Sequence, residues 1–359
     1  MTLNDIASLR LVNQQIAVSR FTSANDLVAW MGAIQSQDFP MAKWAVGLRL
    51  PGLMEQNIQD AIDNGELIRS HLLRPTWHLV SAEDLFWMIE LSALQIRATL
   101  KTRHKQLGLN EVVIKKCNDV IIAALEGNQH LTREELADLL RKIGITNDNN
   151  RLAHILLYAE TEPLICSGRL KGNQQTYALI EERIKKPTGI SKDEALKRLA
   201  GKYFQSRGPA TLQDFKWWSG LSAGDARKAL ESVKSKLDRI IVGSETYWMG
   251  NSIGSMNENK PVIYLLPAYD EFIISYNDRS ASLAEVQIKK AISSNGIFRP
   301  VIISEGQVIG LWKRMAMKEE VLIECQLFKA PGKAVKSGIE FSAEKFGQFL
   351  NKKVQVKYI

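Results

Sequence analysis

The stretch AIQSQDFP, residues 33–40, places two carboxamides and a carboxylate within four positions of an otherwise apolar segment. The apolar residues before it predict a helix that begins at Ser23 or Asn25 and ends at Ile34. Those after it predict a second helix over residues 41–50. Polar side chains at such a junction either cap a helix or contact something. Gln35 and Gln37 are therefore the first candidates for a functional site.

The segments on either side of this stretch complete a recognisable unit. A helix is predicted at residues 3–17 and another at 55–64, closed by Gly65 in the position of a C-cap. Two short runs with β-forming residues follow, at 66–70 and 76–80. Several helices and then a short hairpin is the order of elements in a winged helix.

The same order returns twice along the chain. The second copy contains a capping box at Thr132 and Glu135, and a hairpin whose tip lies at residues 171–173. In the third copy, helices begin at Ser191, Thr211 and Ser222. The predicted fold is mainly α with small β parts, with winged-helix units at 1–108, 109–188 and 189–258 and a C-terminal β-rich domain at 259–359.

The C-terminal domain is predicted from a change of pattern after Pro261. Short apolar runs at 262–266, 300–303, 307–312 and 321–325 are typical of strands. Glu305-Gly306 predicts a hairpin turn between two of them, and residues 342–350 predict a last helix.

Composition limits the class of protein. The chain has 359 residues, of which 45% are hydrophobic and 24% charged, as in soluble globular proteins. Neither a secretion signal nor an apolar run of about 20 residues is present, so we expect a cytoplasmic, nucleoid-associated protein. The net charge of +8 is compatible with a polyanionic partner without requiring one.

The sequence predicts neither a metal site nor a cofactor. The three cysteines form no CxxC pair, and the five histidines lack metal-ligand spacing, so we expect free buried thiols. The absence of a P-loop, a Rossmann glycine pattern and a serine-nucleophile elbow argues against nucleotide or hydrolase chemistry of those kinds.

A Gln-x-Gln pair can support one particular reaction. A carboxamide is no general base, but its oxygen accepts a hydrogen bond, so it can hold a water molecule and stabilise a nearby cation. That suffices where the leaving group is already activated, as in a purine alkylated at N7. The alternative is a capping or surface feature at the end of a helix.

The first predicted hairpin concentrates cations around an aromatic residue. Arg69, His71, Arg74, Trp77 and His78 lie within ten positions of one another. Such a hairpin can contact phosphates and wedge against a base step. The alternative is an ordinary hairpin with Trp77 buried.

Two later segments also stand out. LLPAYDEF (265–272) continues to Arg279, and GLWKR (310–314) ends at Arg314. Asp270 and Glu271 resemble a catalytic carboxylate pair, but as sequence neighbours they are expected to point apart. A polar turn after a buried strand is the favoured interpretation.

Together these residues resemble a known family, the winged-helix DNA glycosylases of the AlkZ/YcaQ type. The resemblance rests on Gln35-Ser36-Gln37, on residues 69–80, and on the two later segments, 265–279 and 310–314. It covers nearly the whole chain. Gln-x-Gln is the pattern of the AlkZ branch, whereas Ser36 and Trp77 depart from the residues typical at those positions.

The resemblance implies a monofunctional glycosylase that removes N7-alkylated purines from duplex DNA, with interstrand crosslinks as a further substrate. Gln35 and Gln37 would be catalytic. The five hairpin residues, Arg279 and Arg314 would bind DNA. From the sequence itself we expect a monomer without a metal or nucleotide cofactor. The alternative is a non-enzymatic winged-helix DNA-binding protein or transcriptional regulator.

Overall fold

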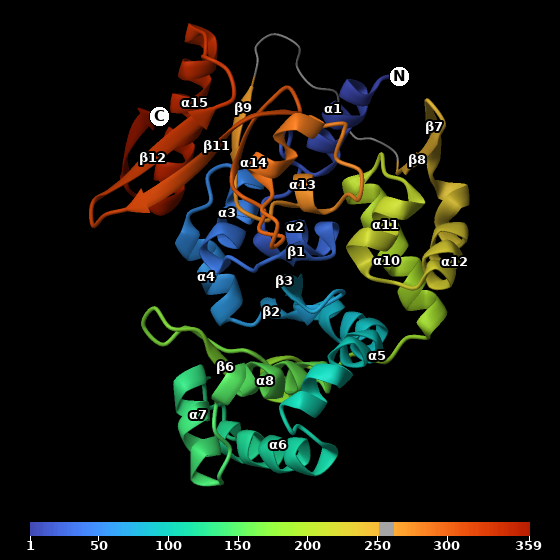
Figure 1. Cartoon of the computed structure of the whole chain (residues 1–359), viewed down its shortest axis with the longest axis vertical. Helices are drawn as coiled ribbons and strands as arrows, with labels where there is room; N and C mark the ends of the chain where they lie inside the picture. The colour runs from blue at the N-terminus through green and yellow to red at the C-terminus, as the bar shows by residue number, and fades with distance from the viewer. Residues whose placement is uncertain (251–261) are drawn as a thin grey trace. The chain divides into compact units, whose positions relative to one another are not determined.

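A computed structural model describes residues 1–250 and 262–359 (Figure 1). Its contacts divide the chain into a first unit, Met1–Gln59 with Leu196–Ile359, and a second unit, Asp60–Ala195. The predicted boundary between the third winged helix and the C-terminal domain, at residues 258 and 259, lies outside the described residues.

The N-terminal segment is helical and belongs mainly to the first unit. It comprises α1 (Leu3–Asn13), α2 (Ala24–Met31), β1 (Ile34–Gln35), α3 (Phe39–Arg49) and α4 (Glu55–Asp63).

The second unit contains the first hairpin and the whole second winged helix. Its elements are β2 (Leu67–Leu72), β3 (Thr76–Ser81), α5 (Ala82–Gln106), α6 (Glu111–Leu125), β4 (Leu131–Thr132), α7 (Arg133–Lys142), a short 3-10 helix (Asp148–Asn150), α8 (Arg151–Thr161), β5 (Ile165–Ser167), β6 (Thr176–Leu179) and α9 (Ile180–Arg183).

The first unit resumes at Leu196, within α10 (Lys192–Arg207). The third winged helix consists of α10, α11 (Leu212–Ser219), α12 (Ala223–Val233), a 3-10 turn (Lys234–Lys236), β7 (Asp238–Val242) and β8 (Glu245–Met249). The C-terminal domain comprises β9 (Ile263–Leu266), α13 (Glu271–Ile274), a 3-10 turn (Glu285–Gln287), α14 (Ile288–Ala291), β10 (Val301–Ser304), β11 (Gln307–Ala316), β12 (Glu320–Leu327), α15 (Lys333–Leu350) and β13 (Lys353–Tyr358).

The predicted fold class is confirmed, since the chain is mainly helical with three hairpins and a C-terminal sheet. The hairpins β2–β3, β5–β6 and β7–β8 each pair antiparallel. The Thr132 side chain accepts a hydrogen bond from the Glu135 backbone N–H, and the Glu135 side chain accepts one from the Thr132 backbone N–H. The capping box therefore forms as expected. Each hairpin and cap depends on residues close in sequence, which is why the sequence alone could predict them.

Several predicted helix ends are wrong. α1 ends at Asn13 rather than at residue 17, because Gln15 has a left-handed φ of 61°. α2 ends at Met31 rather than Ile34, because Gly32 has a φ of 72°. α3 begins at Phe39 rather than Met41, with Pro40 in its first turn, where a missing N–H costs nothing. The long helix α5 and the final strand β13 were not predicted from the sequence.

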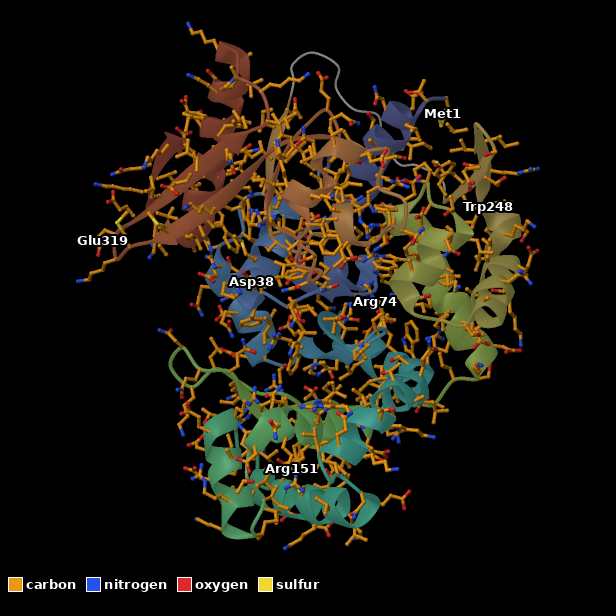
Figure 2. The ribbon with its side chains drawn as sticks, in the orientation of Figure 1. Met1, Asp38, Arg74, Arg151, Trp248 and Glu319 are labelled. Atoms are coloured by element: carbon orange, nitrogen blue, oxygen red, sulfur yellow. The ribbon has the colours of Figure 1, made fainter. Side chains whose placement is uncertain are left out.

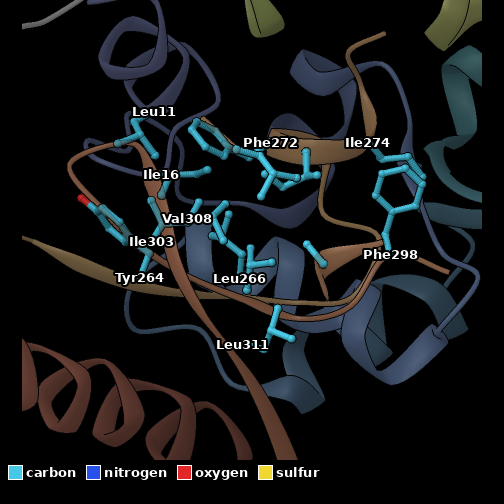
Figure 3. Packing of buried hydrophobic residues seen from close by; sticks show 14 residues of the cluster. Leu11, Ile16, Tyr264, Leu266, Phe272, Ile274, Phe298, Ile303, Val308 and Leu311 are labelled. Carbon is cyan, nitrogen blue, oxygen red and sulfur yellow. The ribbon is translucent and has the colours of Figure 1, made fainter. Parts of the chain in front are cut away.

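The C-terminal sheet joins segments that lie far apart in the sequence. Its strand order is β13-β12-β11-β10-β9, antiparallel except for the β12–β13 pair. The hydrophobic core beside it takes Leu11 and Ile16 from the N-terminal segment together with strand residues such as Leu266 and Ile303 (Figure 3). Residues 1–59 therefore share a core with the end of the chain.

Helices α3 and α15 pack closely within the first unit. A Cβ atom on Gly47 would stand 2.4 Å from the Phe349 ring, so only glycine permits this approach. Trp44 lies edge-on to Phe346 at 5.0 Å and donates from its indole to the Leu265 carbonyl at 2.8 Å. α3 is thus fixed against both α15 and β9.

Cys117, Cys166 and Cys325 are free and buried, as expected. Among residues 1–250 and 262–359, none of the helices has the length and apolar character needed to cross a membrane.

Candidate active site

The segment that carries the two glutamines is a short extended connection between α2 and α3. Gln35 is buried, with 5% exposure, whereas Gln37 is exposed. Asp38, labelled in Figure 2, follows directly. It caps α3, since its side chain accepts a hydrogen bond from the Met41 backbone N–H at 3.2 Å. The fully buried Ser36 separates the two carboxamides, so only Gln37 presents its side chain to solvent.

Glu271 holds this segment from the C-terminal domain. One carboxylate oxygen, Oε1, accepts from the Gln35 backbone N–H at 2.7 Å. The other, Oε2, accepts from Arg207 Nη2 at 2.7 Å and from the Trp218 indole at 3.0 Å, and also from the Ser275 hydroxyl. The carboxylate therefore links α10, α11 and α13 to the backbone of Gln35.

Arg207 completes the attachment from the other side. Its guanidinium donates to the carbonyls of Met31 and Ala33 and pairs with Glu271, all without exposure to solvent. We name Arg207 and Glu271 the clamp. Because the clamp contacts backbone atoms at 31, 33 and 35, it fixes the path of the chain just before Gln37.

The charge state of Glu271 follows from these contacts. Burial disfavours the charged carboxylate, but the positive charge of Arg207 and the hydrogen bonds from Ser275 and the Gln35 backbone outweigh it. Together they lower the pKa of Glu271 to about 2. The clamp is therefore an ion pair throughout the neutral range.

Asp270, next to Glu271, has a different partner. Its two oxygens accept from Arg49 Nη1 and Nη2 at 2.8 and 2.9 Å, and Arg49 also donates to the side chain and backbone of Gln14. The two carboxylates do point apart, as predicted. They follow a turn after the buried strand β9, as the favoured interpretation predicted, but both are themselves buried, with 2% and 1% exposure. A buried carboxylate requires a cation, and arginines from distant segments supply it.

The first hairpin has its own contacts within the second unit. The Arg69 guanidinium lies 4.0 Å from the centre of the Trp77 ring, and the His71 ring lies 3.8 Å from it. Arg69 also hydrogen-bonds the Gln175 side chain, and His71 pairs with the fully buried Glu160 of α8. Trp77 is half-buried, so the alternative of a fully buried tryptophan does not hold.

The two remaining hairpin residues differ in exposure. His78 is buried, and its Nδ1 donates to the Thr76 carbonyl at 2.9 Å. Arg74 is half-buried and lies in the turn after Leu73, which has a left-handed φ of 59° (Figure 2). Arg74 is therefore the hairpin cation at the tip.

Comparison with known proteins identifies the family. The family model described as DNA glycosylase AlkZ-like matches residues 28–349. The chain belongs to the AlkZ-like DNA glycosylase family.

One curated relative and one solved structure, both from Streptomyces sahachiroi, are similar to this chain. An interstrand DNA cross-link repair glycosylase of Streptomyces sahachiroi is 22% identical over 305 residues, which cover 81% of this chain and 82% of the relative. The solved structure of Streptomyces sahachiroi DNA glycosylase AlkZ matches with a TM-score of 0.81 at 18% identity, covering all of both chains. The family makes the protein a DNA glycosylase, a hydrolase of N-glycosyl bonds.

In this AlkZ-like glycosylase, Arg279 is tied to its surroundings. It donates from Nε to the Ile273 carbonyl and from Nη1 to that of Asn277, both at 3.1 Å. Its guanidinium lies 5.3 Å from the Trp217 ring and 5.1 Å from the Phe298 ring. These contacts show that Arg279 has a structural role, in addition to the DNA contact that the sequence predicts.

The predicted site residues of the AlkZ-like glycosylase fall in both units. Gln35, Gln37, Arg279 and the half-buried Arg314 of β11 belong to the first unit. The five hairpin residues belong to the second. Their catalytic and DNA-binding roles stay predictions.

Sequence reasoning missed the partners of these residues. Arg207 and Arg49 were not singled out, and neither was Glu160. A signal was available for Arg49, which stands in the apolar run AVGLRL at 45–50. A charged residue on the buried face of a helix must have a partner of opposite charge, but the sequence does not say which.

Proposed function

We propose that the protein excises N7-alkylated purines from duplex DNA. The observation that carries this proposal is the clamped segment, in which Gln35 is buried against Glu271 and Gln37 is exposed. A rigid backbone with one exposed carboxamide is suited to a reaction that needs positioning rather than strong acid or base catalysis.

The reaction follows from the charge of the damaged base. Alkylation at N7 makes the purine cationic, so the glycosidic bond breaks with its electron pair passing to the base, which leaves neutral. A water oxygen forms the new bond to C1′, and its proton passes to bulk water. The sugar carries positive charge in the transition state.

Gln37 supplies the stabilisation in this proposal. Its carboxamide oxygen accepts a hydrogen bond from the attacking water and places partial negative charge near the sugar. Gln35 keeps Gln37 in place through its backbone bond to Glu271. Neither carboxamide takes up the proton of the water molecule, because a carboxamide is no general base.

Interstrand crosslinks are a second proposed substrate. The Streptomyces sahachiroi relative is named an interstrand DNA cross-link repair glycosylase. A crosslink made by a bifunctional alkylator contains N7-alkylated purines, and hydrolysis of one glycosidic bond releases one strand. We propose that the protein acts as a monomer on damaged nucleoid DNA, held by the hairpin cations, Arg279 and Arg314.

The decisive experiment is release of free base from a duplex that contains a single N7-methylguanine. We expect release by the wild type and none from the matched undamaged duplex. A crosslinked duplex serves as the second substrate. Tight binding with no release from either damaged duplex, and with preference for a defined sequence, would favour the DNA-binding regulator instead.

Arg74→Ala is expected to weaken binding to all duplexes alike. Each lost phosphate contact reduces the slope of log Kd against log salt by about 1. The measurement is fluorescence anisotropy on two unrelated duplexes between low and moderate salt. Arg141→Ala, which removes an exposed cation of α7, is the matched control. A loss confined to one sequence would contradict a phosphate contact.

A further inference from the structure

The loop before Glu271 lies beside the glutamine segment. Tyr269 stands between β9 and α13, and its next two neighbours in the chain are both fixed. Asp270 pairs with Arg49 of α3, and Glu271 accepts from the backbone of Gln35. Both partners belong to the N-terminal segment around Gln37, so the loop is anchored to that segment at two consecutive positions.

The backbone of Tyr269 is unusual. Its φ of 58° lies in the left-handed region, which glycine and asparagine adopt readily and bulky residues rarely do. Residues kept in such a conformation by their surroundings occur preferentially at functional sites. Glycine or asparagine would fit this backbone better, and what a tyrosine adds at this position is its ring.

The ring of Tyr269 is half-buried and rests on a second aromatic residue. Its centre lies 6.2 Å from that of Phe298, and its backbone N–H donates to the Phe298 carbonyl at 3.3 Å. Burial and, to a lesser degree, the negative charge of Asp38 raise the pKa of the phenol. The ring is therefore a supported, partly exposed aromatic surface near the residue that follows Gln37.

We propose that Tyr269 is the surface on which the extruded purine stacks, so that it contributes to the choice of substrate. The inference rests on the proposed function. An alkylated base that is not tethered to the other strand, such as N7-methylguanine, leaves the helix before its glycosidic bond can be reached, and enzymes of this kind hold it against aromatic side chains. A cationic purine is attracted to the electron-rich face of a phenol ring more strongly than a neutral one. Tyr269 thereby favours bases that are already activated to leave.

The test uses Tyr269→Asn, which removes the ring and suits a left-handed backbone. We expect N7-methylguanine release to fall by about 10- to 100-fold, the range expected from loss of one base–aromatic stack. The melting temperature should stay within about 3 °C of the wild type, because the strained backbone relaxes as the ring contact is lost. Tyr269→Phe should recover most of the lost rate, since it restores the ring.

Phe341→Ala removes an exposed ring on α15 and is the matched control. Full activity in Tyr269→Asn, or equal losses in Tyr269→Asn and Tyr269→Phe, would overturn the proposal. If Tyr269→Asn unfolds, Tyr269→Gly replaces it, because glycine also accepts this φ.

A binding measurement separates this inference from the proposed function. A 2′-fluoro sugar at the N7-methylguanine slows cleavage, so the intact lesion can be titrated. The wild type should bind this duplex more tightly than an undamaged one, and Tyr269→Asn should lose that preference. Absence of base release by the wild type would count against the proposed function. An unchanged lesion preference in Tyr269→Asn would count against the role of Tyr269 alone.

Discussion

Gln37→Ala is expected to lower the rate of N7-methylguanine release by about 10²–10³-fold, the usual effect of removing one group aimed at transition-state charge. The side chain is exposed, so its loss leaves the fold intact. The clamp contacts the backbone at positions 31, 33 and 35, and these bonds do not involve the Gln37 side chain. Affinity for undamaged duplex should therefore change by less than about threefold.

The measurement is single-turnover release at saturating enzyme, together with Kd by anisotropy. Gln348→Ala, which truncates an exposed glutamine of α15, is the matched control. Parallel loss of rate and affinity would mean that Gln37 binds DNA rather than acting on the sugar. Release at the wild-type rate would exclude a catalytic part for this carboxamide.

Glu271→Gln is expected to reduce the stability of the first unit by about 3–5 kcal/mol, the cost of leaving a buried charge without its partner. The new amide would also direct N–H groups at donors, since Arg207, Trp218 and Ser275 all donate to the carboxylate. A melting temperature lower by roughly 6–20 °C should follow. Base release should fall as well, because the backbone of Gln35 loses its acceptor.

The loss of stability in Glu271→Gln is expected to become smaller as the pH falls. The carboxyl of Glu271 has an ordinary pKa of 4.5, which the folded protein lowers to about 2. Its contribution to stability is complete above about pH 4.5 and is lost as the pH falls toward 2. The gap in melting temperature between the wild type and Glu271→Gln should therefore narrow as the pH is lowered from 5 to 3.

Differential scanning fluorimetry across this range is the measurement. Glu344→Gln, at an exposed position of α15, should melt with the wild type at every pH. A gap that does not change with pH would mean that Glu271 is not charged in the folded protein.

The sequence by itself determined the features that depend on neighbouring residues. Three hairpins, the Thr132 capping box and the strands on either side of Glu305-Gly306 were all predicted at or near their places. Their signals lie within a few positions of one another, so no distant contact was needed to read them. Gln35 and Gln37 were likewise proposed as candidates from a local departure from apolar sequence, and their catalytic role stays a prediction.

Tertiary structure alone decided how the candidate site is built. The burial of Gln35 and the exposure of Gln37 depend on Glu271, which follows more than two hundred residues later. The ion pairs of Arg207 with Glu271 and of Arg49 with Asp270 likewise join residues that lie far apart in the sequence. A charged residue on a buried face indicates that an oppositely charged partner exists. Which residue is the partner depends on the packing of the whole unit, because the two members of an ion pair can lie at any separation along the sequence.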